Sequence, residues 1–118
     1  MDTFLFTRNE AQAAYIYQKL KYLIYDVGLL DNYRQKACCF QIRTKDRRTF
    51  KILSPQHIDI ATRGCVLDSV VIDDNIVLNE DEEKIIREVC GSRLRGSDII
   101  YRDLEEYIYG LFNTPASA

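Results

Sequence analysis

Two adjacent carboxylates end an apolar run near the middle of this chain. Val70, Val71 and Ile72 lead directly into Asp73 and Asp74. An unbroken run of β-branched residues is typical of a strand that is buried on both faces, so the two acids would lie where that strand reaches solvent. Carboxylates in this position can hold a hydrated magnesium ion and orient a water molecule. The structural alternative is that any buried strand can end in acids where it meets solvent.

The residues around these acids resemble the middle of the ATPase cores of helicases and viral terminases. The resemblance covers roughly residues 3–76 and rests on a T-F-L-F-T run followed by a helix, a strand pair, Arg63-Gly64, Asp68 and the acid-tipped strand. It implies that Asp73 would lie on the magnesium side of a nucleotide and that Asp74 would orient water. The similarity to terminases also implies a viral origin.

The chain departs from that family where a nucleotide would bind. No glycine-rich loop ending in Gly-Lys-Ser/Thr occurs in these 118 residues, and such a loop supplies the backbone amides and the lysine that hold the phosphates. The second acid, usually glutamate in that family, is Asp74 here. We therefore expect a non-catalytic adaptor or regulatory binding protein, built on a degenerate motor-ATPase-like core and needing no cofactor.

The alternative class is an enzyme. A magnesium-dependent nuclease, or an ATPase that obtains its phosphate loop from a partner, would use Asp73 and Asp74, with Asp73 as the metal ligand. A nuclease could also draw Asp59, Asp68 and Lys51 into its site, although the usual acid and acid-x-lysine spacing is absent.

A second group of residues carries positive charge along an expected hairpin. Cations spaced in this way can bind the phosphates of a nucleic acid or another acidic partner with little sequence preference. Charged hairpins also keep edge strands from pairing with other molecules, which is the structural alternative. The candidate cations are Arg43, Lys45, Arg47, Arg48, Lys51 and Arg63.

The charge is unevenly distributed along the chain. Residues 1–65 contain 11 Lys and Arg against 6 Asp and Glu, whereas residues 66–118 contain 5 against 12. The folded protein should therefore have regions of opposite sign. The basic region could meet an acidic partner, or the two regions of different copies could associate head to tail.

The chain also contains eight tyrosines. Tyr15, Tyr22 and Tyr25 share one side of the first expected helix, and Tyr101 and Tyr109 recur in the last. Tyrosine is amphipathic and enriched at protein interfaces. These five side chains are candidates for a protein interface or a self-association surface, with packing inside the domain as the equal alternative.

The elements that position these groups follow an α/β pattern. The sequence predicts a small mixed sheet of three to four strands with about three helices, in the order β-α-β-β-β-α-α. The expected strands cover residues 3–7, 37–44, 48–54 and 68–73. Thr7, Asn79 and Ser97 are the expected helix caps, and Gly28 is expected to end the first helix.

Composition limits the remaining possibilities. Residues 1–112 should form one domain, and residues 113–118 have the composition of a flexible tail. No apolar run is long enough to span a bilayer, and no basic segment followed by an apolar stretch marks a secretory signal. We expect a cytoplasmic protein with reduced cysteines that binds a macromolecule rather than a membrane or a small-molecule substrate.

Overall fold

The computed structural model describes residues 2–35, 39–54, 69–76, 78–93 and 99–112, which are organised around one six-stranded sheet. The strands are β1 (Asp2–Phe6), β2 (Leu30–Gln35), β3 (Phe40–Thr44), β4 (Thr49–Leu53), β5 (Ser69–Asp73) and β6 (Ile99–Arg102). Their order across the sheet is β2-β3-β4-β1-β5-β6. Strands β4, β1, β5 and β6 are parallel, whereas β2, β3 and β4 form an antiparallel meander.

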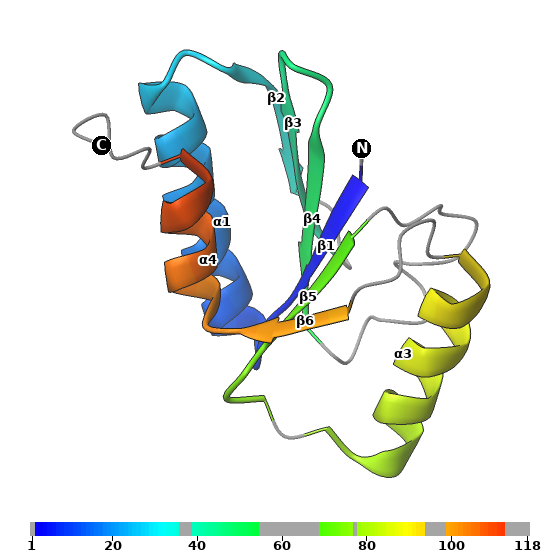
Figure 1. Ribbon diagram of the computed structural model, residues 1–118. Coiled ribbons are helices and arrows are strands. Elements are labelled where there is room, and N and C mark those ends of the chain that lie inside the picture. The colour runs from blue at the N-terminus through cyan, green and yellow to red at the C-terminus, as the bar shows by residue number, and fades with distance from the viewer. Residues whose placement is uncertain (1, 36–38, 55–68, 77, 94–98, 113–118) are drawn as a thin grey trace.

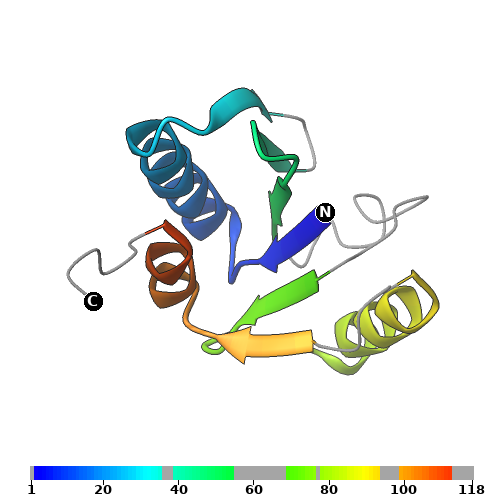
Figure 2. The same ribbon diagram turned by 45° about the horizontal axis from the view of Figure 1, so that its top comes forward.

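The described helices are α1 (Glu10–Asp26), α3 (Glu80–Arg93) and α4 (Leu104–Phe112). Helices α1 and α4 lie side by side on one face of the sheet, and α3 lies on the opposite face (Figures 1 and 2). No helix within the described residues is both long enough and apolar enough to cross a membrane. The α/β class expected from the sequence is confirmed.

Strand β1 is the centre of the core. It pairs with β4 on one side and β5 on the other, and its residues from Thr3 to Phe6 are buried. Because side chains alternate along a strand, Leu5 enters the apolar cluster under α1 and α4, while Phe4 and Phe6 enter the cluster that contains Ile86 of α3. A short apolar run therefore supplies both cores.

The two faces of the sheet are covered to different extents. On the face that carries α3, the cluster around Ile86 spans β1, β4 and β5. Over β2 and β3, no described helix covers this face, and the side chains there are polar. They are Asn32, Arg34, Gln41 and Arg43, with Lys51 of β4 beside them. We call this region the open sheet face.

The sheet is larger than the three to four strands that the sequence predicts, because β2 and β6 were not expected. Strand β2 is almost entirely polar and exposed, so it lacks the alternation that identifies a half-buried strand. Residues Ile99–Arg102 were assigned to the last helix, whose expected cap, Ser97, lies outside the described residues. Parallel pairing with β5 instead makes them a strand, and Asp103 caps α4 by accepting a hydrogen bond from Glu106 N at 3.1 Å.

Two of the other expected helix boundaries are confirmed and one is wrong. Gly28 has a φ of +75° just after α1, and Asn79 and Glu82 exchange the two hydrogen bonds of a capping box. The cap of α1 is Asn9 rather than Thr7, since Asn9 Oδ1 accepts from Gln12 N at 2.8 Å. Thr7 instead extends the sheet: its backbone N donates to Leu53 O at 2.8 Å, and its hydroxyl donates to the same oxygen.

Replacing Asn9 with alanine tests this boundary. The change removes the side-chain acceptor at the start of α1, so Asn9→Ala should lower the free energy of unfolding by about 1 kcal/mol. Urea unfolding of the variant and the wild type measures the difference. Asn9→Ser, which keeps an acceptor, is the control and should lose much less. Equal stability of Asn9→Ala and the wild type would contradict the assigned cap.

Candidate functional site

Asp73 lies at the carboxyl end of β5, beside the point where β1 leads into α1. Its side chain is 1% exposed, and Oδ2 lies 3.2 Å from Arg8 Nε and accepts from Gln12 Nε2 at 3.4 Å. The positive end of the α1 dipole also favours a carboxylate here. Asp73 Oδ1 is buried and has no hydrogen-bond partner among the described residues. A buried carboxylate oxygen without a partner is costly, so a cation that could reach this atom would lower that cost.

Asp73 belongs to a cluster of three acids at one edge of the sheet. One carboxylate oxygen each from Asp73, Asp74 and Asp103 lies within 4.8 Å of the others. Opposite ligands are about 4.2 Å apart around Mg²⁺ and about 5 Å apart around Ca²⁺. A limit of 4.8 Å lies within the span of Ca²⁺, and Mg²⁺ would be held through its bound waters or after a small shift of the side chains. Asp73 and Asp74 are candidates from the sequence, whereas Asp103 is not, because the pattern of residues 97–111 predicts a continuous helix in place of β6.

This edge is the end at which open parallel sheets usually bind ligands. The chain leaves β1 through α1 on one face and leaves β5 toward α3 on the other (Figure 2). Adjacent parallel strands with connections on opposite faces form a topological switch point, with a crevice beyond their carboxyl ends. Ser54 lies at the same end, after β4, and its buried hydroxyl has no hydrogen-bond partner within the part of the chain that the structure describes.

The cations selected from the sequence divide into different environments. Arg43 projects from the open sheet face, where it is exposed. Lys51 lies on the same face, with Nζ 5.3 Å from the centre of the Phe4 ring. Arg34, which sequence analysis missed because β2 was not expected, joins them. Neither Arg34 nor Arg43 forms an ion pair with a carboxylate of the described residues.

Arg48 has a structural role instead. Its guanidinium donates two hydrogen bonds to the Asp46 carboxylate, at 3.0 and 3.1 Å from Nε, and forms a salt bridge with it. It also lies 4.8 Å from the centre of the Phe112 ring, so it joins the β3–β4 hairpin to α4. Arg47 occupies the turn with a φ of +68°, and Lys45 is exposed beside it. Arg63, Asp59 and Asp68 lie outside the described residues.

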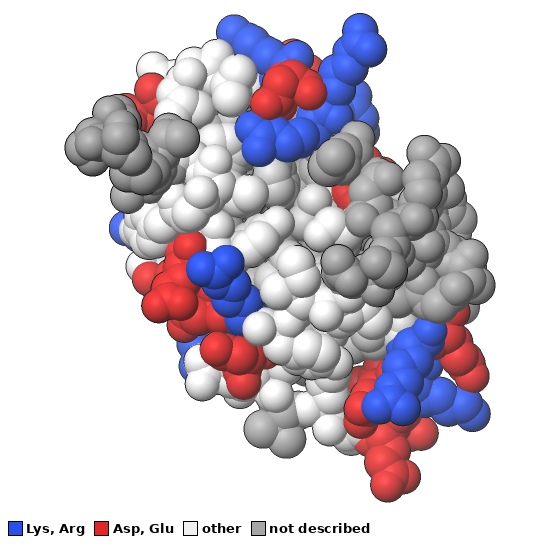
Figure 3. All heavy atoms as spheres, viewed as in Figure 1, with Lys and Arg blue, Asp and Glu red and all other residues white. Residues whose placement is uncertain are grey.

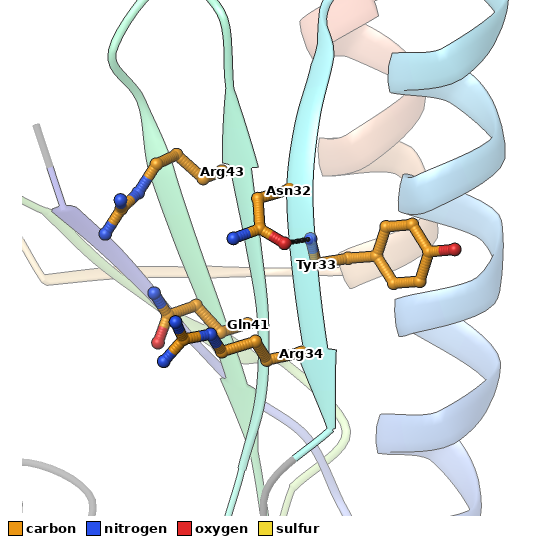
Figure 4. Close-up of a pocket in the computed structure, with 5 residues that line it drawn as sticks. All are labelled: Asn32, Tyr33, Arg34, Gln41 and Arg43. Atoms are coloured by element: carbon orange, nitrogen blue, oxygen red, sulfur yellow. Dashed lines mark hydrogen bonds between the residues drawn. The ribbon is translucent and has the colours of Figure 1, made fainter.

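Strand register arranges the open sheet face in rows. Arg34 is opposite Gln41, which is opposite Lys51, and in the next row Asn32 is opposite Arg43. Figure 4 shows Asn32, Arg34, Gln41 and Arg43 projecting to the side away from α1, around a small hollow of about 20 Å³. Since neighbouring strands are about 4.8 Å apart, cations and amides lie close together across three strands.

The charge distribution agrees with the asymmetry of the sequence. Lys and Arg side chains gather at the end of the molecule that carries the β3–β4 hairpin, while Asp and Glu are more frequent toward α3 (Figure 3). The first turn of α3 alone contains Glu80, Asp81, Glu82 and Glu83. An acidic ligand on the open sheet face would therefore lie away from the most acidic helix.

The tyrosines selected as an interface also separate. Tyr22 and Tyr25 are 65% and 69% exposed, and they line a hollow of about 290 Å³ between α1 and β2. Its other lining residues are Gln18, Lys21, Leu30 and Tyr33. Tyr15 is exposed farther along α1, Tyr101 is exposed on β6 rather than in a helix, and Tyr109 is half-buried in α4. Tyr33, on β2, was not selected from the sequence.

Comparisons of this chain with protein-family models, with curated proteins and with solved structures found no match. A functional assignment therefore rests on the geometry of these residues.

The Arg48–Asp46 pair gives a pH-dependent prediction. Hydrogen bonds from Arg48, and then from Thr44, hold the pKa of Asp46 below its ordinary value. A depressed folded pKa contributes stability above the unfolded pKa of about 3.9, and this contribution is lost as the pH falls through the folded pKa. At neutral pH, Asp46→Asn should be less stable than the wild type by about 0.5 kcal/mol, because the pair is exposed.

Urea unfolding of both proteins at neutral pH and at progressively lower pH measures this difference. It should shrink as the wild-type carboxylate becomes protonated. A difference that is the same at neutral and acid pH would show that the charge of Asp46 does not stabilise the hairpin.

Proposed function

We propose that this chain is a non-catalytic nucleic-acid-binding protein that acts as an adaptor or regulator, and that its ligand lies on the open sheet face. The observation that carries the proposal is the set of cations on this face. Arg34 and Arg43 project from adjacent strands, are exposed, and have no carboxylate partner among the described residues. Lys51 and Lys45 extend the positive charge along the same hairpin.

The chemistry of the face suits phosphates. Arginine presents a planar group of donors that matches phosphate oxygens, and the amides of Asn32 and Gln41 can donate to sugars, phosphates or bases. A rigid sheet holds these side chains in register, so less conformational entropy is lost on binding than with a flexible basic tail.

The ancestry suggested by the sequence stays part of the proposal. An acid-tipped strand at the carboxyl edge of a parallel sheet supports descent from a motor-ATPase-like core, whose scaffold could serve for binding alone. A viral origin and a cytoplasmic location would suit such a compact adaptor.

Nucleic-acid binding is tested by fluorescence anisotropy with a labelled single-stranded oligothymidylate at about 50 mM and about 200 mM salt. Arg34→Ala combined with Arg43→Ala should weaken binding about tenfold or more, since each arginine loses a charge-assisted hydrogen bond. The slope of log affinity against log salt should fall by about 1.4, because each phosphate contact to a single strand contributes about 0.7.

The matched control is Lys84→Ala combined with Arg87→Ala on α3, which removes the same charge from exposed positions away from the open sheet face. This variant should bind nearly as the wild type does. If both double variants lose the same affinity, only net charge matters and the proposed face is wrong. Absence of any binding, with self-association that depends on Arg34 and Arg43, would identify an acidic protein surface as the ligand instead.

A second function is favoured by the acid cluster and by Asp73 Oδ1, which is buried and has no hydrogen-bond partner in the described ranges. If the chain is an enzyme, Asp73, Asp74 and Asp103 would hold a magnesium ion, which when bound would polarise phosphoryl oxygens. Arg8 lies beside Asp73 and could contact the same phosphate. This arrangement would suit a nuclease or a partner-assisted ATPase.

Magnesium binding is measured by the melting temperature of the protein in a magnesium titration. A ligand that binds only the folded state at a hundred times its dissociation constant stabilises it by about 2.7 kcal/mol, so a functional site should give a clear increase. Asp74→Asn, at an exposed position, should remove the increase, whereas Asp81→Asn on α3 should retain it. A melting temperature that does not respond to magnesium would eliminate this second function.

A further inference from the structure

The hollow between α1 and β2 and the open sheet face lie on opposite sides of the edge strand β2. Tyr33 and Arg34 are consecutive residues of β2, and their side chains project to opposite faces of the sheet (Figure 4). Tyr33 lines both the hollow between α1 and β2 and the small hollow among the cations. A chain that follows the edge of the sheet would therefore meet cations on one side and aromatic rings on the other.

The hollow combines aromatic surface with a fixed positive charge. Lys21 Nζ lies 4.7 Å from the centre of the Tyr33 ring and 5.0 Å from that of Tyr17. Tyr17 is itself buried and stacks on Phe40 with ring centres 4.7 Å apart. The ring that Lys21 contacts is therefore held in place by core packing. Tyr22, Tyr25 and Tyr33 are each more than half exposed.

We propose that this hollow, between Tyr22, Tyr25 and Tyr33, takes a nucleobase of a single-stranded nucleic acid whose phosphates lie on Arg34 and Arg43. The inference rests on the proposed function and specifies its ligand class. The hollow has a volume of about 290 Å³, slightly below the usual range of about 300–1,000 Å³ for pockets that bind drug-sized ligands. This size suits one flat heterocycle.

Charge and stacking together select a single strand. The positive charge of Arg34, Arg43 and Lys21 complements a phosphate backbone, and exposed tyrosine rings stack on bases with little sequence preference. In a duplex the bases are stacked on each other and are not available to such a hollow, whereas in a single strand they can turn outward. The nucleic acid must therefore be unpaired where it crosses β2.

The test uses the full chain, fluorescein-labelled oligothymidylate, an abasic strand of the same length, and a duplex of the same length. Tyr22→Ala combined with Tyr25→Ala should weaken binding to oligothymidylate between about 5-fold and 150-fold, the effect of one lost stacked base. Binding to the abasic strand should be unchanged in this variant, and wild-type protein should bind oligothymidylate more tightly than the duplex.

Two controls separate stacking from folding. Tyr22→Phe combined with Tyr25→Phe keeps both rings and should bind as the wild type does. Tyr101→Ala removes an exposed tyrosine from β6, on the far edge of the sheet, and should leave binding unchanged. The melting temperatures of all variants show whether each is folded, and a folded Phe variant that lost binding would show that the hydroxyls rather than the rings hold the ligand.

The outcomes distinguish this inference from the proposed function. If the Tyr22→Ala and Tyr25→Ala variant binds oligothymidylate as the wild type does, or loses the abasic strand equally, no base stacks here and the inference is wrong. In either case binding that still depends on Arg34 and Arg43 leaves the proposed function standing. If no strand binds the wild type at all, both the inference and the proposed function fail.

Discussion

The burial of β1 on both faces is the constraint on which the rest of the structure depends. Strand β1 has parallel partners on both sides, and its side chains supply both apolar clusters. A strand of this kind requires helices above and below it, which α1 and α4 provide on one face and α3 on the other. The helices cover only part of the sheet. Both candidate sites lie beside the covered part, so the helices determine where the candidate functional residues can be exposed.

The sheet consequently has two regions of different character. Where the strands are parallel, their carboxyl ends bring together Asp73, Asp74 and Asp103, and the start of α1 supplies Arg8. Where the strands are antiparallel, the face opposite α1 stays polar and carries the cations. The hydrogen-bonding pattern of one sheet thus separates an acidic edge from a basic face, which explains how the chain can have a small net charge and still offer a cationic surface.

The sequence predicts the parts of the fold that lie in the core and misses those that lie at the edges. A run of β-branched residues such as Val70–Ile72 favours a central strand, and the pair of Asn79 and Glu82 indicates where a helix begins. The two edge strands could not be recognised locally. Residues Leu30–Gln35 are polar because β2 is exposed, and Ile99–Arg102 become a strand only through pairing with β5. Tertiary contacts override local propensity at such positions.

The sites follow the same division. Asp73 and Asp74 were recognisable because they end a strand that the sequence identifies, whereas Asp103, Arg34 and Tyr33 depend on the two unexpected strands. The spacing of cations in the hairpin could not show that Arg48 turns toward Phe112 and Asp46 while Arg43 projects from the other face. Consecutive residues of a strand project to opposite faces of the sheet. Tyr33 and Arg34 therefore indicate two surfaces, one on each face, only once β2 is known to be a strand.

The central claim is that a polar sheet face left open by the helices holds a nucleic acid. Backbone amide chemical shifts during titration with unlabelled oligothymidylate test it most directly, because they report where the ligand lies. The structure predicts changes in Leu30–Gln35, Phe40–Thr44 and the end of α1 near Tyr22 and Tyr25, with α3 unaffected. Changes confined to α3 or to the residues around Asp73, or no changes at all, would contradict the claim.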